Sequence, residues 1–161
     1  MNYSYTPAQA RDYIYQTFFD KWNDPVAGWQ GLKDDEGQPI YLAQEPKLEW
    51  DNDIDDDADV TEPTVYLYVR HYTSRNRAIG GRAVERKGFV LAKVKVPSDS
   101  GLKTADALGY IVKTAFENKR ATGDGKGILF RTWRPTETGI VQGIRFQIVS
   151  TVDFEYDELS S

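Results

Sequence analysis

The strictest pattern in this sequence is an alternation of apolar and polar residues close to its C-terminal end. The even positions carry Ile144, Phe146, Ile148, Val152, Phe154 and Tyr156. The odd positions carry Arg145, Gln147, Asp153, Glu155 and Asp157. A period of two is that of a β-strand, whose successive side chains point to opposite faces of a sheet. The segment therefore predicts one long strand with an apolar face and a polar face.

Two earlier segments alternate in the same way. The first carries apolar residues at Val65, Leu67 and Val69, and the second at Val90, Ala92, Val94 and Val96. We expect two antiparallel neighbours, the second of which ends at Pro97 because proline has no N–H to donate. A further strand is predicted from Ile128 to Trp133, with a turn from Pro135 to Gly139 after it.

Helical spacing is found in two other segments. Thr6-Pro7-Ala8-Gln9 has the form of a helix start, with a hydroxyl N-cap and proline at the first helical position. This helix should stop before Asp24-Pro25, and its stripe is formed by Ala10, Ile14, Thr17, Phe18 and Trp22. A second helix is expected after Gly101, with one face made of Ala105, Leu108, Val112, Ala115 and Phe116.

These elements follow the order α, β, β, α, β, β. They predict an α+β fold in which a mostly antiparallel sheet packs against two helices and a long loop joins the central strands. The length of 161 residues suits one domain over 1–161. Glycines and prolines mark residues 24–62 as an acidic loop insertion, with brief edge strands at Ile40 to Leu42 and Leu48 to Trp50. A short flexible tail is expected from about residue 158.

Composition argues against several classes of protein. The formal net charge of -5 is unlike that of a general nucleic-acid coat, which is normally basic. The absence of cysteine excludes disulfides and Cys-ligated metals, and it suits a reducing cytoplasm. The N-terminus lacks a basic segment followed by an apolar one, and charges such as Lys93 interrupt the longest apolar runs. We therefore expect no contact with a membrane.

One acidic run has the spacing of a calcium-binding loop. Positions 1, 3, 5, 7, 9 and 12 of such a loop match Asp51, Asp53, Asp55, Asp57, Asp59 and Glu62. The sixth position requires glycine for its sharp turn, but it is Asp56 here, and Pro63 stands where the exiting helix would begin. The simpler interpretation is a solvated acidic loop, so no metal or cofactor is expected.

No catalytic constellation is evident. The turn Gly123 to Gly127 contains Lys126, but a strand follows it, whereas a phosphate-binding loop leads into a helix. His71 is the only histidine, and no serine lies in a G-x-S-x-G elbow. The acidic row of Asp153, Glu155 and Asp157 is most simply a surface facing solvent or a channel. We predict a protein without enzymatic activity, and a small hydrolase is the more distant alternative.

Basic residues concentrate between the two central strands. Only Glu85 opposes Arg70, Arg75, Arg77, Arg82, Arg86 and Lys87. The middle of this stretch, Ala78-Ile79-Gly80-Gly81, is apolar and rich in glycine, as in a contact arm. The predicted interface therefore comprises Arg75, Arg77, Ile79, Gly80, Gly81, Arg82 and Arg86. Nucleic acid is the rival partner, because guanidinium groups also suit phosphates, and a merely solvated loop is the third alternative.

Around this stretch the sequence resembles the tail-terminator-like proteins of long-tailed bacteriophages. The resemblance covers roughly residues 65 to 157 and rests on a series of short motifs. They are Arg86-Lys87-Gly88-Phe89-Val90, Val94-Lys95-Val96-Pro97, Gly101, Ala105-Asp106-Ala107-Leu108, Ala115-Phe116-Glu117 and Val152-Asp153-Phe154-Glu155-Tyr156. The stretch from Asp24 to Glu62 is longer than the connection usual in that family.

The resemblance implies a structural virion protein that forms a ring, commonly hexameric, at the head-proximal end of the tail tube. Such a ring stops tube polymerisation and joins the tail to the head, so the implied partners are other copies of the chain, the tube protein and a head-tail connector or head completion protein. DNA would pass through the channel without specific binding, and assembly would take place in the host cytoplasm. A ring needs an interface that closes by rotation, which the arginine stretch of one subunit and an acidic surface of the next would supply. That surface is either Asp153, Glu155 and Asp157 or the run from Asp51 to Glu62, and either one could instead line the channel. A neighbouring connector, a tube subunit and a DNA-binding module are the alternatives.

Overall fold

The computed structural model describes residues 5–50, 62–76, 83–97, 99, 101–121, 127–141 and 145–159. Two long helices and one mixed sheet make up this part of the chain, which confirms the predicted α+β class. The elements in order are α1 (Pro7–Trp22), the 3-10 helix η1 (Trp29–Gly31), β1 (Lys47–Glu49), β2 (Thr64–Asn76), β3 (Ala83–Pro97), α2 (Gly101–Phe116), β4 (Leu129–Val141) and β5 (Arg145–Leu159).

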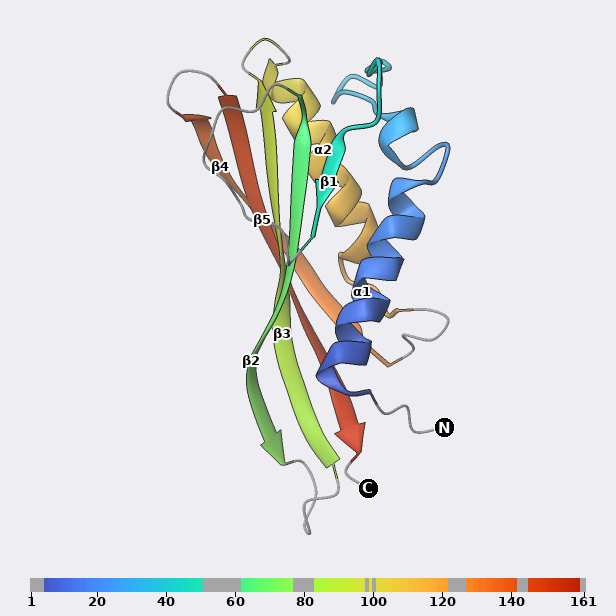
Figure 1. The fold of residues 1–161 in the computed structure, drawn as a ribbon, viewed down its shortest axis with the longest axis vertical. Coiled ribbons are helices and arrows are strands. Elements are labelled where there is room, and N and C mark those ends of the chain that lie inside the picture. Colours follow the sequence, from blue (N-terminus) through green and yellow to red (C-terminus); the bar gives the residue numbers. More distant parts are fainter. Residues whose placement is uncertain are drawn as a thin grey trace.

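The sheet has the strand order β1-β2-β3-β5-β4. Only the short β1 pairs in parallel, against Thr64 to Tyr66 of β2, and all other neighbours are antiparallel. Two hairpins, β2–β3 and β4–β5, therefore supply most of the sheet. Figure 1 shows these strands as long and twisted, with α1 and α2 on the same side of the sheet.

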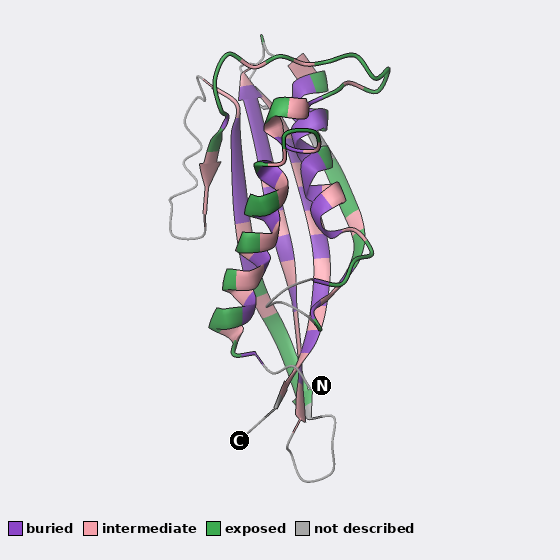
Figure 2. Ribbon diagram, turned by 90° about the vertical axis from the view of Figure 1, so that its right-hand side faces the viewer, coloured by how far each residue is buried: buried purple, intermediate pink, exposed green. Residues whose placement is uncertain are grey.

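The core lies between the helices and one face of the sheet. Register places Val90 beside Val69 on one side and Val152 on the other, and all three are fully buried. From the helices, Phe18 stacks on Phe116 with ring centroids 6.2 Å apart. Figure 2 shows this buried layer behind the two helices, of which α1 exposes much of its outer side while α2 is mostly buried or intermediate. The even residues of β5 thus face the core, as the alternation predicts.

Local sequence accounts for α1 as predicted. The Thr6 hydroxyl accepts a hydrogen bond from the Gln9 N–H, and the Gln9 side chain accepts one from the Thr6 N–H, which satisfies two donors at the helix start. The buried residues follow the helical period and are Ala10, Ile14, Phe18 and Trp22. Thr17, also expected in the stripe, is only partly buried, and its hydroxyl donates to the Tyr13 carbonyl.

The stretch between the central strands is shorter than predicted. β2 continues to Asn76 and β3 begins at Ala83, so Arg70, Arg75, Arg86 and Lys87 are strand residues. A bulge between His71 and Thr73 shifts the register, which breaks the alternation that would have marked the strand in the sequence. The far ends of β2 and β3 extend past α1 in Figure 1, so no helix imposes an apolar face there.

Three boundaries elsewhere also differ from the predictions. The expected turn from Pro135 to Gly139 lies within β4, an edge strand where proline costs no inner hydrogen bond. β5 continues to Leu159, which pairs with Ala83, and the rest of the tail predicted from about residue 158 lies outside the described residues. Of the two brief strands expected within 24–62, only β1 forms, where it pairs with Thr64 to Tyr66 of β2, whereas Ile40 to Leu42 has no strand conformation.

Candidate functional site

The predicted acidic row lies on the face of the sheet that the helices leave uncovered. Asp153 and Glu155 occupy odd positions of β5, and register places Glu155 opposite Lys87 of β3. The next pair along β3 and β5 sets Glu85 opposite Asp157, while Arg75 of β2 is the other neighbour of Glu85. The long twisted strands thus bring predicted arginines and predicted carboxylates together within one chain.

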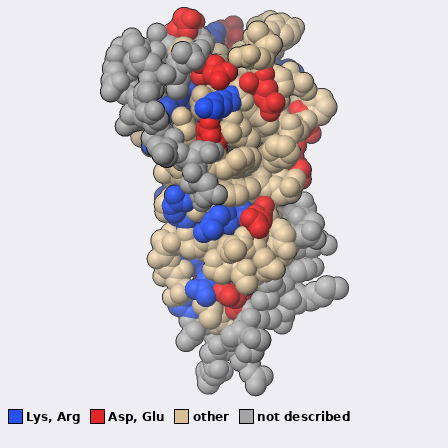
Figure 3. Space-filling model, in the orientation of Figure 1, with Lys and Arg blue, Asp and Glu red and all other residues tan. Residues whose placement is uncertain are grey.

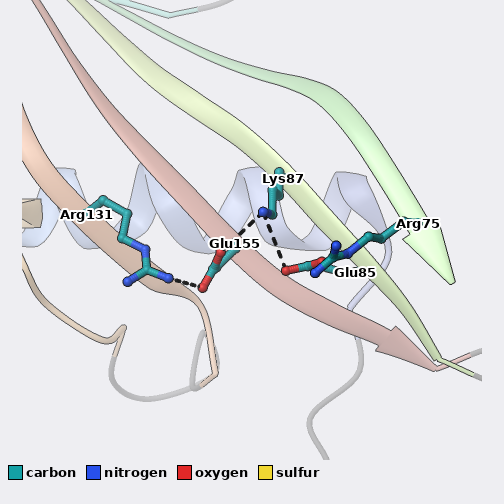
Figure 4. A network of polar contacts seen from close by, with 5 residues as sticks. All are labelled: Arg75, Glu85, Lys87, Arg131 and Glu155. Carbon is teal, nitrogen blue, oxygen red and sulfur yellow. Dashed lines mark hydrogen bonds and ion pairs between the residues drawn. The ribbon is translucent and has the colours of Figure 1, made fainter. Parts of the chain in front are cut away.

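These side chains form a series of ion pairs across four strands. Arg75 Nε lies 2.5 Å from Glu85 Oε2, and Lys87 Nζ lies 3.7 Å from Glu85 Oε1 and 4.0 Å from Glu155 Oε2. Figure 4 follows the series from Arg75 through Glu85, Lys87 and Glu155 to Arg131 on β4. A separate pair joins Arg134 and Asp153, with an Nη2-to-Oδ1 distance of 3.0 Å. We call these residues the charged ladder: Arg75, Glu85, Lys87, Glu155, Arg131, Arg134 and Asp153.

The charged ladder alternates in sign, so it has little net field of its own. On the side of the molecule drawn in Figure 3, acidic and basic side chains are likewise interspersed. Glu85 anchors the ladder, since its side chain is 2% exposed whereas that of Arg75 is 71% exposed. At the other end of this face Lys95 is buried, and its ammonium lies 4.9 Å from the Tyr66 ring centroid.

Arg86 does not point to the charged ladder, although it is next to it in sequence. It lies on the helix side, where its Nε is 2.6 Å from Glu158 Oε2. Nearby, His71 Nε2 and the Tyr156 hydroxyl share a hydrogen bond of 2.7 Å. The predicted interface is therefore divided between two faces of the sheet. Its members Arg77, Ile79, Gly80, Gly81 and Arg82 lie outside the described residues.

The environment of His71 favours its neutral form. Burial lowers the pKa of His71 below its ordinary value of 6.5, and the positive charges of Arg11 and Arg86 lower it further. Burial also raises the pKa of the Tyr156 hydroxyl to about 12, with a contribution from Glu158. Both groups are therefore held in their neutral forms at this end of the core.

The two motifs considered for ligand binding fall mostly outside the described residues. This applies to Asp51, Asp53, Asp55, Asp57 and Asp59, and to Gly123 through Lys126. Glu62 is described, and its carboxylate accepts a hydrogen bond from the Gln44 amide. Gly127 has a positive φ of 98°, as befits a turn before β4. Within the described residues no group of three or more His, Cys, Asp or Glu is arranged to hold a metal ion.

Sequence reasoning missed a cavity of about 330 Å³ between α2 and β4. Its lining consists of Asp106, Gly109, Trp133, Pro135 and Ile148. The Trp133 Nε1 atom is buried and meets no hydrogen-bond acceptor among the described residues. We call this the Trp133 cavity. It results from packing between elements that are distant in sequence, so no local motif could have predicted it.

Comparison with known proteins gives a fold without a function. No family model matches the chain, and no curated protein matches it. No described helix is long and apolar enough to cross a membrane. One solved structure aligns over 94% of this chain and 98% of its own, with 15% sequence identity and a TM-score of 0.55. That protein bears only a serial designation, so the likeness establishes a shared α+β fold and nothing about activity.

Proposed function

We propose that this chain is a structural, non-enzymatic virion subunit that forms a ring, commonly hexameric, at the head-proximal end of a phage tail tube. There it would end tube polymerisation and join the tail to the head connector or head completion protein. The proposal rests on the resemblance in sequence to tail-terminator-like proteins. The observation that carries it is the arm, defined as residues 73 to 87, which includes the ends of β2 and β3 that extend past α1 (Figure 1).

The arm suits contact between subunits for two physical reasons. Thr73, Ser74 and Arg75 are all exposed, so they are not needed for the core of their own chain. The strand order β1-β2-β3-β5-β4 also leaves β4 as the edge on the opposite side of the sheet from β2. Contacts between unlike surfaces on opposite sides of a subunit close into a ring when each step is a rotation.

The charged ladder bears on the choice between assembly and DNA binding. A surface that binds DNA presents an excess of lysine and arginine to the phosphates. In the ladder each cation instead lies beside a carboxylate of the same chain, and the formal net charge of the whole chain is -5. These features disfavour a DNA-binding module and suit a surface past which DNA moves without being held. A connector or a tube subunit would share the assembly class and differ in copy number per virion.

The decisive experiment measures the mass of the purified protein by light scattering, with and without tail tubes. Negative-stain microscopy of the same samples shows whether rings are present. We expect rings in at least one condition. Arg77→Glu with Arg82→Glu should weaken ring formation or tube binding by about tenfold or more, because it removes the net positive charge of the arm. Arg86 is left intact because it pairs with Glu158. Lys33→Glu with Arg120→Glu is the matched control, since both residues are exposed and the change in charge is equal. A monomer under every condition, with salt-dependent binding to duplex DNA, would refute the proposal in favour of a DNA-binding module.

A further inference from the structure

The Trp133 cavity owes part of its space to the glycine at residue 109 of α2. A Cβ built at this position would meet no atom within 4 Å, and φ there is not positive, so the backbone is one that any residue can adopt. Alanine would fit, and it favours a helix more strongly than glycine does. Neither the packing nor the backbone of this chain therefore requires Gly109. What the glycine provides is open space beside Trp133.

The walls of the cavity favour one kind of side chain. Trp133 and Pro135 of β4 and Ile148 of β5 are apolar, and the volume of about 330 Å³ lies at the lower end of the range for ligand pockets, about 300–1,000 Å³. Asp106 also lines the cavity, but it already interacts within its own chain. The buried Trp133 Nε1 donates to no acceptor among the described residues, and leaving such a donor unpaired is costly. A tyrosine combines an aromatic ring with a hydroxyl oxygen that can accept this hydrogen bond.

Tyr41 is a tyrosine that its own chain leaves free to bind elsewhere. At 89% exposed it is the most exposed of the large apolar side chains that the structure describes, so it contributes nothing to the core. The backbone beside it is nevertheless held in place, because the Ile40 N–H donates to the carbonyl of the buried Leu32 over 2.9 Å. A side chain on a fixed backbone loses less conformational entropy on binding than one on a free segment.

Charge and position indicate that the tyrosine and the cavity meet between two copies of the chain. Residues 24–50, which include Tyr41, contain six carboxylates and two lysines, so their formal charge is -4. Residues 101–141, which include α2 and β4, contain seven lysines and arginines and four carboxylates, so their formal charge is +3. The stretch with Tyr41 leads into β1 at one edge of the sheet, whereas Trp133 lies in β4 at the other edge (Figure 1). Complementary surfaces on opposite edges are those that a head-to-tail ring requires.

Individual side chains agree with these net charges. Asp35 and Glu36, a few residues before the tyrosine, are exposed and form no ion pair with another described residue. At the cavity, Lys113 Nζ lies 5.8 Å from the Trp133 ring centroid, and the Arg134 side chain is 60% exposed. Exposed ion pairs within a chain contribute little, so these two cations remain available to carboxylates of a partner.

We infer that the Trp133 cavity receives Tyr41 of a second copy of this chain, with Trp133 Nε1 donating to the tyrosine hydroxyl. This contact rests on the proposed ring function and joins neighbouring subunits in addition to the arm. It also gives a role to part of the stretch from Asp24 to Glu62, which is longer than the connection usual in tail-terminator-like proteins.

The first test uses the full chain and measures its self-association constant by analytical ultracentrifugation, with tail tubes added if rings require them. Tyr41→Ser should weaken association about tenfold or more, because an aromatic anchor in a pocket carries much of the affinity of an interface. Tyr41→Phe keeps the ring but lacks the hydroxyl, so its association should be intermediate. The temperature of unfolding should stay the same for both variants. Val26→Ser changes another exposed apolar side chain of the same acidic stretch, and as the matched control it should leave association unchanged.

Substitutions at Gly109 separate binding from folding. Gly109→Ala should raise the temperature of unfolding, because alanine stabilises the helix and its Cβ has room. Gly109→Leu places a larger side chain in the space that the tyrosine would occupy. Both variants should weaken association, and the leucine variant should weaken it more. A position that matters only for folding would instead change association and the temperature of unfolding in the same direction.

Cross-linking tests the pairing directly, because the chain has no cysteine of its own. Ala43→Cys lies close to Tyr41 in sequence and Thr136→Cys close to Trp133, and both positions are exposed. A chain with the first substitution, mixed with a size-tagged chain that has the second, should form a linked pair with a short bismaleimide. Gln16→Cys, at an exposed position of α1, should form no such pair with Thr136→Cys.

The results distinguish this contact from the ring function itself. If the wild-type chain forms rings that Tyr41→Ser and Gly109→Leu leave unchanged, the tyrosine does not enter the cavity and the ring function stands. If these variants still form rings but no longer bind tubes, the occupant belongs to the tube protein and the contact between copies is refuted. If the wild-type chain forms no ring with or without tubes, the proposed function fails and the contact fails with it.

Discussion

The two faces of β5 differ in how specific their side-chain contacts are. On the helix side, Val152 and Phe154 pack against whatever apolar atoms the opposite layer provides, and many combinations of side chains would serve. On the other face, Glu155 requires a cation at one position, and Lys87 and Arg131 come to it only through the register of three strands. An alternating sequence thus predicts which face of the sheet a side chain lies on. It does not predict which residue of the neighbouring strand lies opposite, and charged side chains need that register to find a partner.

The largest effect is expected from breaking the helix-side face at Phe154. Its ring lies 6.3 Å from that of Phe130 and is fully enclosed, so Phe154→Ala leaves a cavity that the long strands cannot close. We expect the free energy of unfolding to fall by about 3–5 kcal/mol. Urea denaturation followed by circular dichroism measures it. A loss below about 1 kcal/mol would mean that β5 does not carry the core.

Gly88 of β3 allows the Phe154 side chain to pack closely against the helix-covered face of the sheet. A Cβ at residue 88 would lie 2.5 Å from Phe154 Cζ and 2.1 Å from the Arg70 carbonyl oxygen. Only glycine therefore lets the Phe154 ring lie directly over β3. The sequence contains this glycine within Arg86-Lys87-Gly88-Phe89-Val90, but its reason is visible only once Phe154 is its neighbour in the sheet.

The predictable part of the molecule is the part governed by local periods. The capped start of α1, the buried face of α2 and the even residues of β5 all followed from spacing, because a helix or strand repeats its own geometry. The bulge at His71 and the edge position of Pro135 interrupted that repetition, so the starts of β2 and β4 were predicted as strands but the parts beyond these residues were predicted as loop or turn. The Trp133 cavity had no local signal, and the sequence showed the acidic row of β5 without the partners that register gives it in the charged ladder.

Substitutions on the helix-free face of the sheet should lower the free energy of unfolding by less. The loss should depend on how deeply the substituted side chain is buried. Glu85→Gln leaves Arg75 and Lys87 without their shared carboxylate and places an amide in a site that is 2% exposed. We expect a loss of about 1–3 kcal/mol in the free energy of unfolding, measured as for Phe154→Ala.

Asp153→Asn is the matched comparison for Glu85→Gln, because it also removes one carboxylate from the charged ladder. The Asp153 side chain is 36% exposed and its partner Arg134 is 60% exposed, so solvent and salt screen the pair. The expected loss is about 0–1 kcal/mol and should decline further at high salt. Equal losses for the two variants would show that burial does not determine how much each ion pair of the charged ladder contributes to stability.

The smallest effect on stability is expected from His71, which is a polar residue on the apolar, helix-covered side of the sheet. Its folded-state pKa is lowered by burial and by Arg11 and Arg86, while Glu158 acts in the opposite direction and Tyr156 shares its hydrogen bond. The unfolded chain therefore binds a proton more readily, and stability should fall as pH decreases through the ordinary histidine value of 6.5. His71→Gln retains a hydrogen-bonding side chain but cannot titrate. Thermal unfolding between about pH 5 and 8 should thus give a shallower loss on the acid side for His71→Gln than for the natural chain, beyond the contribution that the carboxylates make to both. Parallel curves for the two proteins would mean that His71 keeps its ordinary pKa, and that the helix side of the sheet is more open to water at this end than its packing indicates.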